Sequence, residues 1–74
     1  MFREKEMKAA SDLENLVPAI KEMVSRIHDG TENQPYSAVY WLRREMSRIV
    51  ATLGAGQPNT NKVEEYYRKQ MQND

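Results

Sequence analysis

Apolar residues recur along the first part of the chain with the period of an α-helix. They lie three or four residues apart at Leu13, Leu16, Val17, Ile20, Met23, Val24 and Ile27. At about 100° per residue, these positions form one stripe that is roughly 120° wide. The pattern predicts an amphipathic helix over residues 3–28. We expect it to end at Gly30, because glycine readily adopts the left-handed conformation that follows a helix.

The start and the middle of this helix each allow two interpretations. Ser11 and Glu14 have the spacing of a capping box, which predicts a start at Ser11. Residues 3–10 are themselves rich in helix-forming side chains, which predicts an earlier start. Pro18 removes one backbone hydrogen bond inside the pattern, at a cost of about 3 kcal/mol. We expect a kink over residues 14–18, with a complete break there as the alternative.

A second apolar stripe follows a turn-like segment at residues 29–35. Pro35 suits the first turn of a helix, because N–H groups there have no hydrogen-bond partner within the helix. Gly54 suits the C-terminal end of the same helix. The pattern predicts a helix over residues 35–53. Its stripe consists of Val39, Leu42, Met46, Ile49, Val50 and Leu53. Two helices of similar length joined by a short loop form an antiparallel hairpin.

The third predicted helix is short and covers residues 62–71. Asn61 and Glu64 resemble a cap pair at its start. An isolated helix of two or three turns is marginal in water. Its order therefore depends on docking through its apolar side chains, which are Val63, Tyr66, Tyr67 and Met71.

Length and composition favour a small all-α domain over residues 1–74 that associates with itself. The 74 residues carry 11 Lys+Arg and 11 Asp+Glu, and 39% are hydrophobic. A chain of this size buries only about 60% of its unfolded surface. Two hairpins that associate into a four-helix bundle bury both wide stripes more completely. We therefore expect a homodimer, with a heteromeric complex, in which a partner supplies the missing helices, as the alternative.

The expected core and dimer contacts belong to the two stripes. They are Leu13, Leu16, Val17, Ile20, Val24, Ile27, Val39, Leu42, Met46, Ile49, Val50 and Leu53. These side chains are almost all branched aliphatic, so their burial is the main stabilising term that the sequence offers.

The sequence contains no catalytic or metal-binding constellation. It has no Cys and a single His, which argues against disulfides and thiolate or multi-His metal sites. His28 and Asp29 are neighbours on a helix and do not face each other. We expect no enzyme activity, no cofactor and no metal. No apolar run approaches the roughly 20 residues of a membrane helix, and the charged first residues do not resemble a signal peptide, so we expect a cytoplasmic protein without membrane contact.

Trp41 is the unusual residue of the second helix. It lies about 200° from Val39 on a helical wheel, which predicts a place opposite the apolar stripe. Three interpretations compete: the third helix folds back over it, a second copy covers it, or it anchors a different protein. Stacking of Arg44 and Arg48 on its ring is a purely structural alternative. Trp, Tyr and Arg are enriched at binding hot spots. The expected partner-binding residues are Tyr40, Trp41, Arg44, Arg48, Tyr66 and Tyr67.

These observations favour a small non-enzymatic module that binds another protein and regulates or inhibits it. In size and layout, though in no specific motif, the chain resembles small helical-hairpin secretion chaperones and antiactivators. The alternative is a nucleic-acid-binding accessory protein. It would use Arg43, Arg44, Arg48, Lys62, Arg68 and Lys69. A net charge of zero gives no bulk attraction to nucleic acid, which disfavours this alternative.

Overall fold

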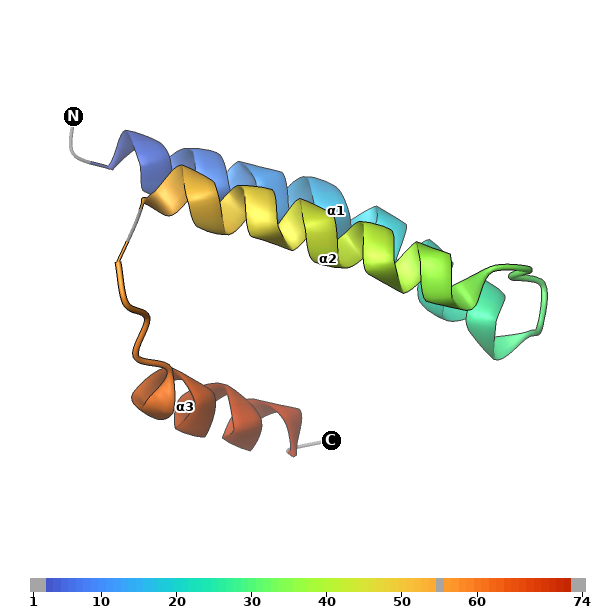
Figure 1. Cartoon of the computed structure of the whole chain (residues 1–74). Helices are drawn as coiled ribbons and strands as arrows, with labels where there is room; N and C mark the ends of the chain where they lie inside the picture. The colour runs from blue at the N-terminus through green and yellow to red at the C-terminus, as the bar shows by residue number, and fades with distance from the viewer. Residues whose placement is uncertain (1–2, 55, 73–74) are drawn as a thin grey trace.

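The structure, a computed structural model, describes residues 3–54 and 56–72, and this part of the chain contains helices and loops only. The helices are α1 (Glu4–His28), α2 (Pro35–Leu53) and α3 (Asn61–Met71). The all-α class is therefore confirmed. The chain reverses direction after α1, so that α2 runs back alongside it, whereas α3 lies apart from both (Figure 1).

α1 begins at Glu4, well before Ser11, so a start at the Ser11 capping box is wrong. The carbonyl of Arg3 already accepts the first helical hydrogen bond from the N–H of Met7, at 2.9 Å. Helix-forming side chains favour this early start. Glu4 and Glu6 also place negative charge in the first turn, where the helix dipole favours it.

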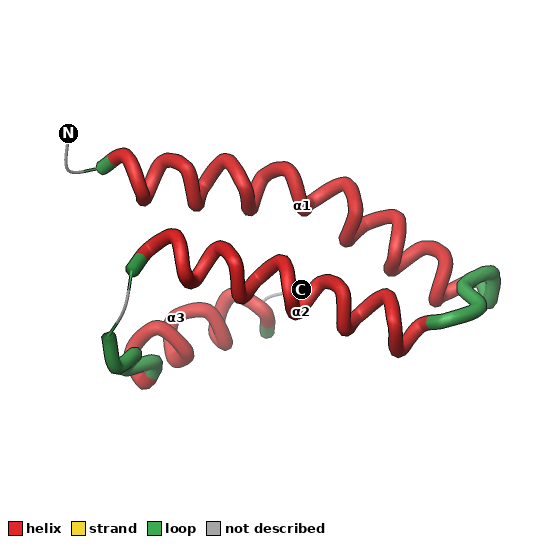
Figure 2. Tube along the Cα trace, turned by 45° about the horizontal axis from the view of Figure 1, so that its top comes forward, coloured by secondary structure: helices red, strands yellow, loops and turns green. Residues whose placement is uncertain are grey.

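Pro18 lies inside α1 without ending it. The helix is continuous from Glu4 to His28, so the alternative of a complete break is wrong. Pro18 has no N–H to donate to the carbonyl of Glu14, and its ring is exposed to solvent on the side away from the core. Figure 2 shows α1 as one helix whose direction changes about half-way along its length.

The turn after α1 is closed by backbone hydrogen bonds. Gly30 has a positive φ of 76°, and its N–H donates to the carbonyl of Ile27 at 3.3 Å. The N–H of Thr31 donates to the carbonyl of Arg26 at 2.9 Å. The Arg26 side chain in turn pairs with Glu32, with 3.5 Å between Nε and Oε1. The predicted glycine at the end of α1 is confirmed, as is the proline at the start of α2.

The contact between α1 and α2 buries only part of the two apolar stripes. Ala9, Leu16 and Ile49 are buried, and Ile20, Leu42 and Met46 pack partly against them. In the described chain α1 and α2 each pack against one helix only, and one neighbour does not cover the whole width of such an apolar stripe. The remaining expected core residues are more than 40% exposed in the single chain: Leu13, Val17, Val24, Ile27, Val39, Val50 and Leu53.

α3 packs against neither α1 nor α2 within the described part of the chain. Its Val63, Tyr66 and Tyr67 are each more than half exposed, so the interpretation in which α3 folds back over Trp41 is wrong for this structure. The predicted cap pair is also wrong. Asn59 Oδ1, rather than a side chain of α3, accepts a hydrogen bond from the Asn61 N–H, at 3.2 Å.

Candidate interaction site

The contact line between α1 and α2 has two flanks of different character. Leu16 and Ile49 lie at its centre, each 7% exposed. The residues that precede them by one position, Asn15 and Arg48, line one common groove. A step of one residue turns about 100° around a helix. Because α1 and α2 run in opposite directions, moving one residue back from Leu16 and one residue back from Ile49 leads to the same side of the contact line.

The flank with Asn15 and Arg48 is a polar groove of about 520 Å³. Its floor is formed by Leu16 and Ile49, and its walls are mostly polar or charged. They are Lys8, Asp12, Asn15 and Ala19 from α1 and Trp41, Glu45, Arg48 and Thr52 from α2. Lys8 and Asp12 pair across the wall, with 3.4 Å between Nζ and Oδ2.

Trp41 therefore does not point directly away from α1, and the placement opposite the core is wrong. It borders the groove beside Glu45 and Ile49 and stays 44% exposed. The reason is the rotation of α2 about its axis. The least exposed positions of α2 are Ala38, Leu42, Glu45, Met46, Ile49 and Thr52. The side of α2 that faces α1 thus includes the polar residues Glu45 and Thr52, while Val39 and Val50, at one edge of the apolar stripe, stay exposed to solvent.

The opposite flank is apolar. Val17 and Val50 follow Leu16 and Ile49 by one position, so the same rotation turns both toward this second flank. Val50 and Trp41, nine residues apart, point in roughly opposite directions from α2. We define the apolar face by its half-exposed members, which are Leu13, Val17 and Val24 of α1 and Val39, Val50 and Leu53 of α2.

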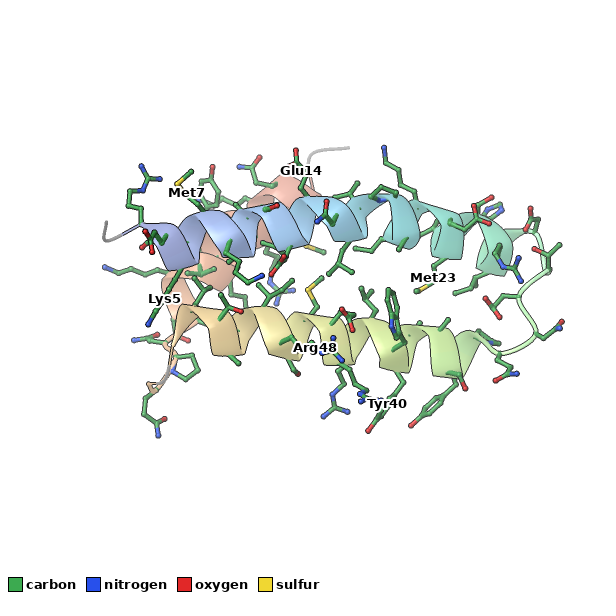
Figure 3. The ribbon with its side chains drawn as sticks, turned by 90° about the horizontal axis from the view of Figure 1, so that it is seen from above. Lys5, Met7, Glu14, Met23, Tyr40 and Arg48 are labelled. Atoms are coloured by element: carbon green, nitrogen blue, oxygen red, sulfur yellow. The ribbon has the colours of Figure 1, made fainter. Side chains whose placement is uncertain are left out.

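The outer side of α2 carries aromatic rings and arginines that contact one another. The rings of Tyr36 and Tyr40 stack with centroids 6.1 Å apart and planes at 26°. The guanidinium carbon of Arg43 lies 5.7 Å from the centroid of the Tyr40 ring. Figure 3 shows Tyr40 pointing away from α1, while Met23 points from α1 toward α2. The cation–π contact thus involves Arg43 and Tyr40, and not Trp41 as considered from the sequence.

The charge on this side of α2 is only partly compensated. Arg48 pairs with Glu45, with 3.6 Å between Nη1 and Oε2. Within the described chain, neither Arg43 nor Arg44 lies within ion-pair distance of a carboxylate. Glu45 itself turns toward the groove, so the outer side is basic even though the chain has no net charge.

Two shallow hollows connect these residues into one surface. The first, of about 280 Å³, is lined by Tyr36, Ser37, Tyr40, Trp41 and Arg44. The second, of about 400 Å³, is lined by Tyr40, Arg43, Arg44, Ser47 and Arg48. Both include Tyr40 and Arg44, so the hollows are adjacent. We call this surface the aromatic-basic side of α2.

The structure brings four of the six expected binding residues together on this side, namely Tyr40, Trp41, Arg44 and Arg48. Tyr66 and Tyr67 lie on α3, where their rings contact each other edge to face at 5.0 Å. Two further residues, Tyr36 and Arg43, belong to the site. Their spacings of four and three residues from Tyr40 place them on the same side of a helix and were the available signal.

Metal, membrane and family comparisons add no further functional indication. The described residues contain no group of three or more His, Asp or Glu side chains placed to hold a metal ion. None of the helices as described is long and apolar enough to cross a membrane. Comparison of the chain with protein-family models, curated proteins and solved structures finds no match.

Proposed function

We propose that this protein is a small non-enzymatic interaction module that binds and regulates another protein through the aromatic-basic side of α2. One observation carries the proposal: Tyr40, Trp41 and Arg44 line a single hollow on the surface of one continuous helix. Trp, Tyr and Arg are the residue types that dominate binding energy at protein interfaces. A rigid helix presents them at little cost in conformational entropy.

The two hollows suggest how a partner would be held. An apolar partner side chain would enter the hollow between Tyr36, Tyr40 and Trp41, where it would contact ring faces. A partner carboxylate would pair with Arg44, whose guanidinium has no carboxylate within the described chain to displace. Arg–carboxylate pairs are strong and directional when they form two parallel hydrogen bonds.

Self-association is part of the same proposal. We propose that α1 and α2 form an antiparallel hairpin, that two hairpins close into a four-helix bundle, and that the module acts as this homodimer. The small core of the single chain supports this, because among the residues that the structure describes only Ala9, Leu16 and Ile49 are buried. So few buried side chains provide little stability on their own.

The decisive experiment compares partner capture by matched variants. The immobilised protein would be incubated with a lysate of its source, and captured proteins would be quantified by mass spectrometry. A true partner would bind the wild type and be lost with both Trp41→Ala and Arg44→Glu. Asn15→Ala, an exposed position of α1, is the control and would retain it. Circular dichroism would show unchanged helix content in all variants. If no captured protein distinguishes the variants from the control, the proposal is wrong.

A second candidate function is nucleic-acid binding. One observation favours it: Arg43, Arg44 and Arg48 line one hollow together with Tyr40, whose ring would stack on a base. Fluorescence anisotropy with a labelled single-stranded 20-mer tests it. Binding that weakens steeply with salt, and that Arg44→Glu abolishes, would support this function, because phosphate contacts release counterions. Absence of binding at low salt would exclude it.

A further inference from the structure

The apolar face is a surface of the molecule that the proposed binding side does not use. It runs across both helices, and its members Val24, Val39, Val50 and Leu53 are between 51% and 64% exposed. Single exposed apolar residues are ordinary on protein surfaces, but a contiguous patch of this kind marks an interaction site. The opposite flank is lined mostly by polar and charged side chains, so the exposed aliphatic residues are concentrated on one flank of the α1–α2 pair.

The total surface of the chain indicates how much area awaits a partner. The chain exposes 6996 Å². A folded globular monomer of 8.7 kDa exposes about 4,700 Å². The chain thus exposes roughly 2,300 Å² more than a globular monomer would. Part of this surplus belongs to α3, which packs against neither other helix in the described chain, and part belongs to the incompletely buried α1–α2 pair. A specific protein–protein interface buries about 800 Å² on each partner, an area smaller than the surplus.

The short helix of the same chain does not match the apolar face in width. The face extends over two adjacent helices, α1 and α2, whereas α3 is a single helix of 11 residues. Neighbouring helix axes lie about 8–10 Å apart, so one helix covers only part of a face that is two helices wide. A second α1–α2 pair matches the face in width, because it presents the same apolar residues on two helices.

We infer that the apolar face is the homodimer interface and that each copy places its Val17 and Val50 against the other copy. This inference rests on the homodimer in the proposed function and identifies which surface forms it. The dimer is isologous, so the same patch contacts itself across a two-fold axis. Leu13, Val24, Val39 and Leu53 are buried on both sides, and the two thin cores merge into one.

This arrangement leaves the part of the aromatic-basic side formed by Tyr40, Trp41 and Arg44 free in both copies. Arg43, seven residues before Val50, points in nearly the same direction as Val50 and lies at the edge of the interface. Val50 and Trp41 point in roughly opposite directions from α2, so closing the apolar face does not cover Trp41. Tyr40 points away from α1 (Figure 3), and Arg44 follows it by one turn on the same side. The dimer is therefore bivalent, with two equivalent binding sides on its outside.

Light scattering over a concentration series tests the interface with matched charge substitutions. Wild type is expected at twice 8.7 kDa. Val17→Glu and Val50→Glu each place one carboxylate per chain in the interface and should raise the dimer dissociation constant at least about 100-fold. Asn15→Glu introduces the same charge on the opposite flank and should leave the mass unchanged. Circular dichroism identifies a variant that fails to fold. If one of the two valine variants does so, the mass of the other tests the interface.

The remaining outcomes overturn the inference. A wild-type mass of one chain at all concentrations would show that no second copy covers the face. A dimer that persists with both valine variants would place the interface elsewhere.

The single Trp41 provides an independent readout. Its acrylamide quenching is expected to be equal in the wild-type dimer and in monomeric Val17→Glu. Quenching that decreases on dimerisation would show that the Trp41 flank is the interface, which overturns the inference. Partner capture by Trp41→Ala and Arg44→Glu is measured separately, so failure of the binding function and failure of the interface are distinguished.

Discussion

Leu16 of α1 and Ile49 of α2 belong to one buried cluster between the two helices, and each is only 7% exposed. Their neighbours in sequence define the two flanks of that contact. Asn15 and Arg48 line the polar groove, whereas Val17 and Val50 lie on the apolar face. The burial of Leu16 and Ile49 fixes the rotation of each helix about its axis, and this rotation determines which residues are exposed to partners.

Truncating this pair should destabilise the protein more than any surface substitution. We expect Leu16→Ala and Ile49→Ala each to lower the free energy of unfolding by about 2–4 kcal/mol, because each removes buried methyl groups and leaves a cavity. Urea denaturation at one fixed protein concentration would measure it, since the stability of an oligomer depends on concentration.

Val63→Ala in α3 is the matched control and should change the free energy of unfolding by less than about 0.5 kcal/mol. Val63 is 53% exposed and α3 contacts neither other helix in the described chain. An equally large loss with Val63→Ala would show that α3 contributes to the core in solution.

The helices were predictable from the sequence, but the rotation of α2 was not. The period of apolar residues and the positions of Gly30 and Pro35 are local signals that determine where helices lie. The stripe of α2 is wider than the contact with one neighbouring helix, so several rotations would bury part of it. Trp41 lies about 200° from Val39, at the exposed edge of the stripe, but only about 80° from the buried Ile49.

The candidate site was predictable only where its residues are neighbours on one helix. Tyr40, Trp41, Arg44 and Arg48 are close in sequence on one helix, so their proximity follows from helix geometry. The separation of Tyr66 and Tyr67 from them depends on tertiary contacts of α3, which local patterns do not encode. Likewise, the apolar face emerges only when both helices are placed side by side.

Replacing Gly30 should show the conformational requirement of the first turn. Its φ of 76° is unfavourable for residues with a side chain, so Gly30→Ala should lower the free energy of unfolding by about 1–2 kcal/mol. Beyond Gly30 and its two chain neighbours, no atom lies within 4 Å of an added Cβ, so the loss comes from the local backbone conformation rather than from tertiary contacts. Thermal unfolding followed by circular dichroism would measure it.

Gly30→Asn is the informative companion to this alanine variant. Asparagine tolerates the left-handed region better than alanine, so its unfolding temperature should lie between those of Gly30→Ala and the wild type. Equal unfolding temperatures for all three proteins would contradict a role of the positive φ.

Replacing Pro18 should stabilise α1. Pro18→Ala supplies an N–H that can donate to the carbonyl of Glu14 and removes the ring that crowds that carbonyl. The position is exposed, so the substitution disturbs no core contact. We expect the free energy of unfolding to rise by about 1–3 kcal/mol, measured by urea denaturation at fixed concentration.

Ser25→Ala, another exposed position inside α1, is the control and should add no more than about 0.5 kcal/mol. A decrease in stability with Pro18→Ala would instead show that the proline shapes α1 to fit its surroundings, and that a straight helix packs less well.

The contact between Arg43 and Tyr40 should be measurable as a coupling energy. With the guanidinium carbon 5.7 Å from the ring centroid, a cation–π contact at an exposed site contributes about 0.5–1 kcal/mol. A double-mutant cycle of Arg43→Gln and Tyr40→Leu isolates this energy from the effects of each substitution alone. The matched cycle pairs Arg44→Gln with Tyr40→Leu, because Arg44 also lines the hollows beside Tyr40 without stacking on its ring. We expect its coupling to be near zero. If the two cycles gave equal couplings, the arginines would share the ring, and the binding side would not be held in one arrangement before a partner arrives.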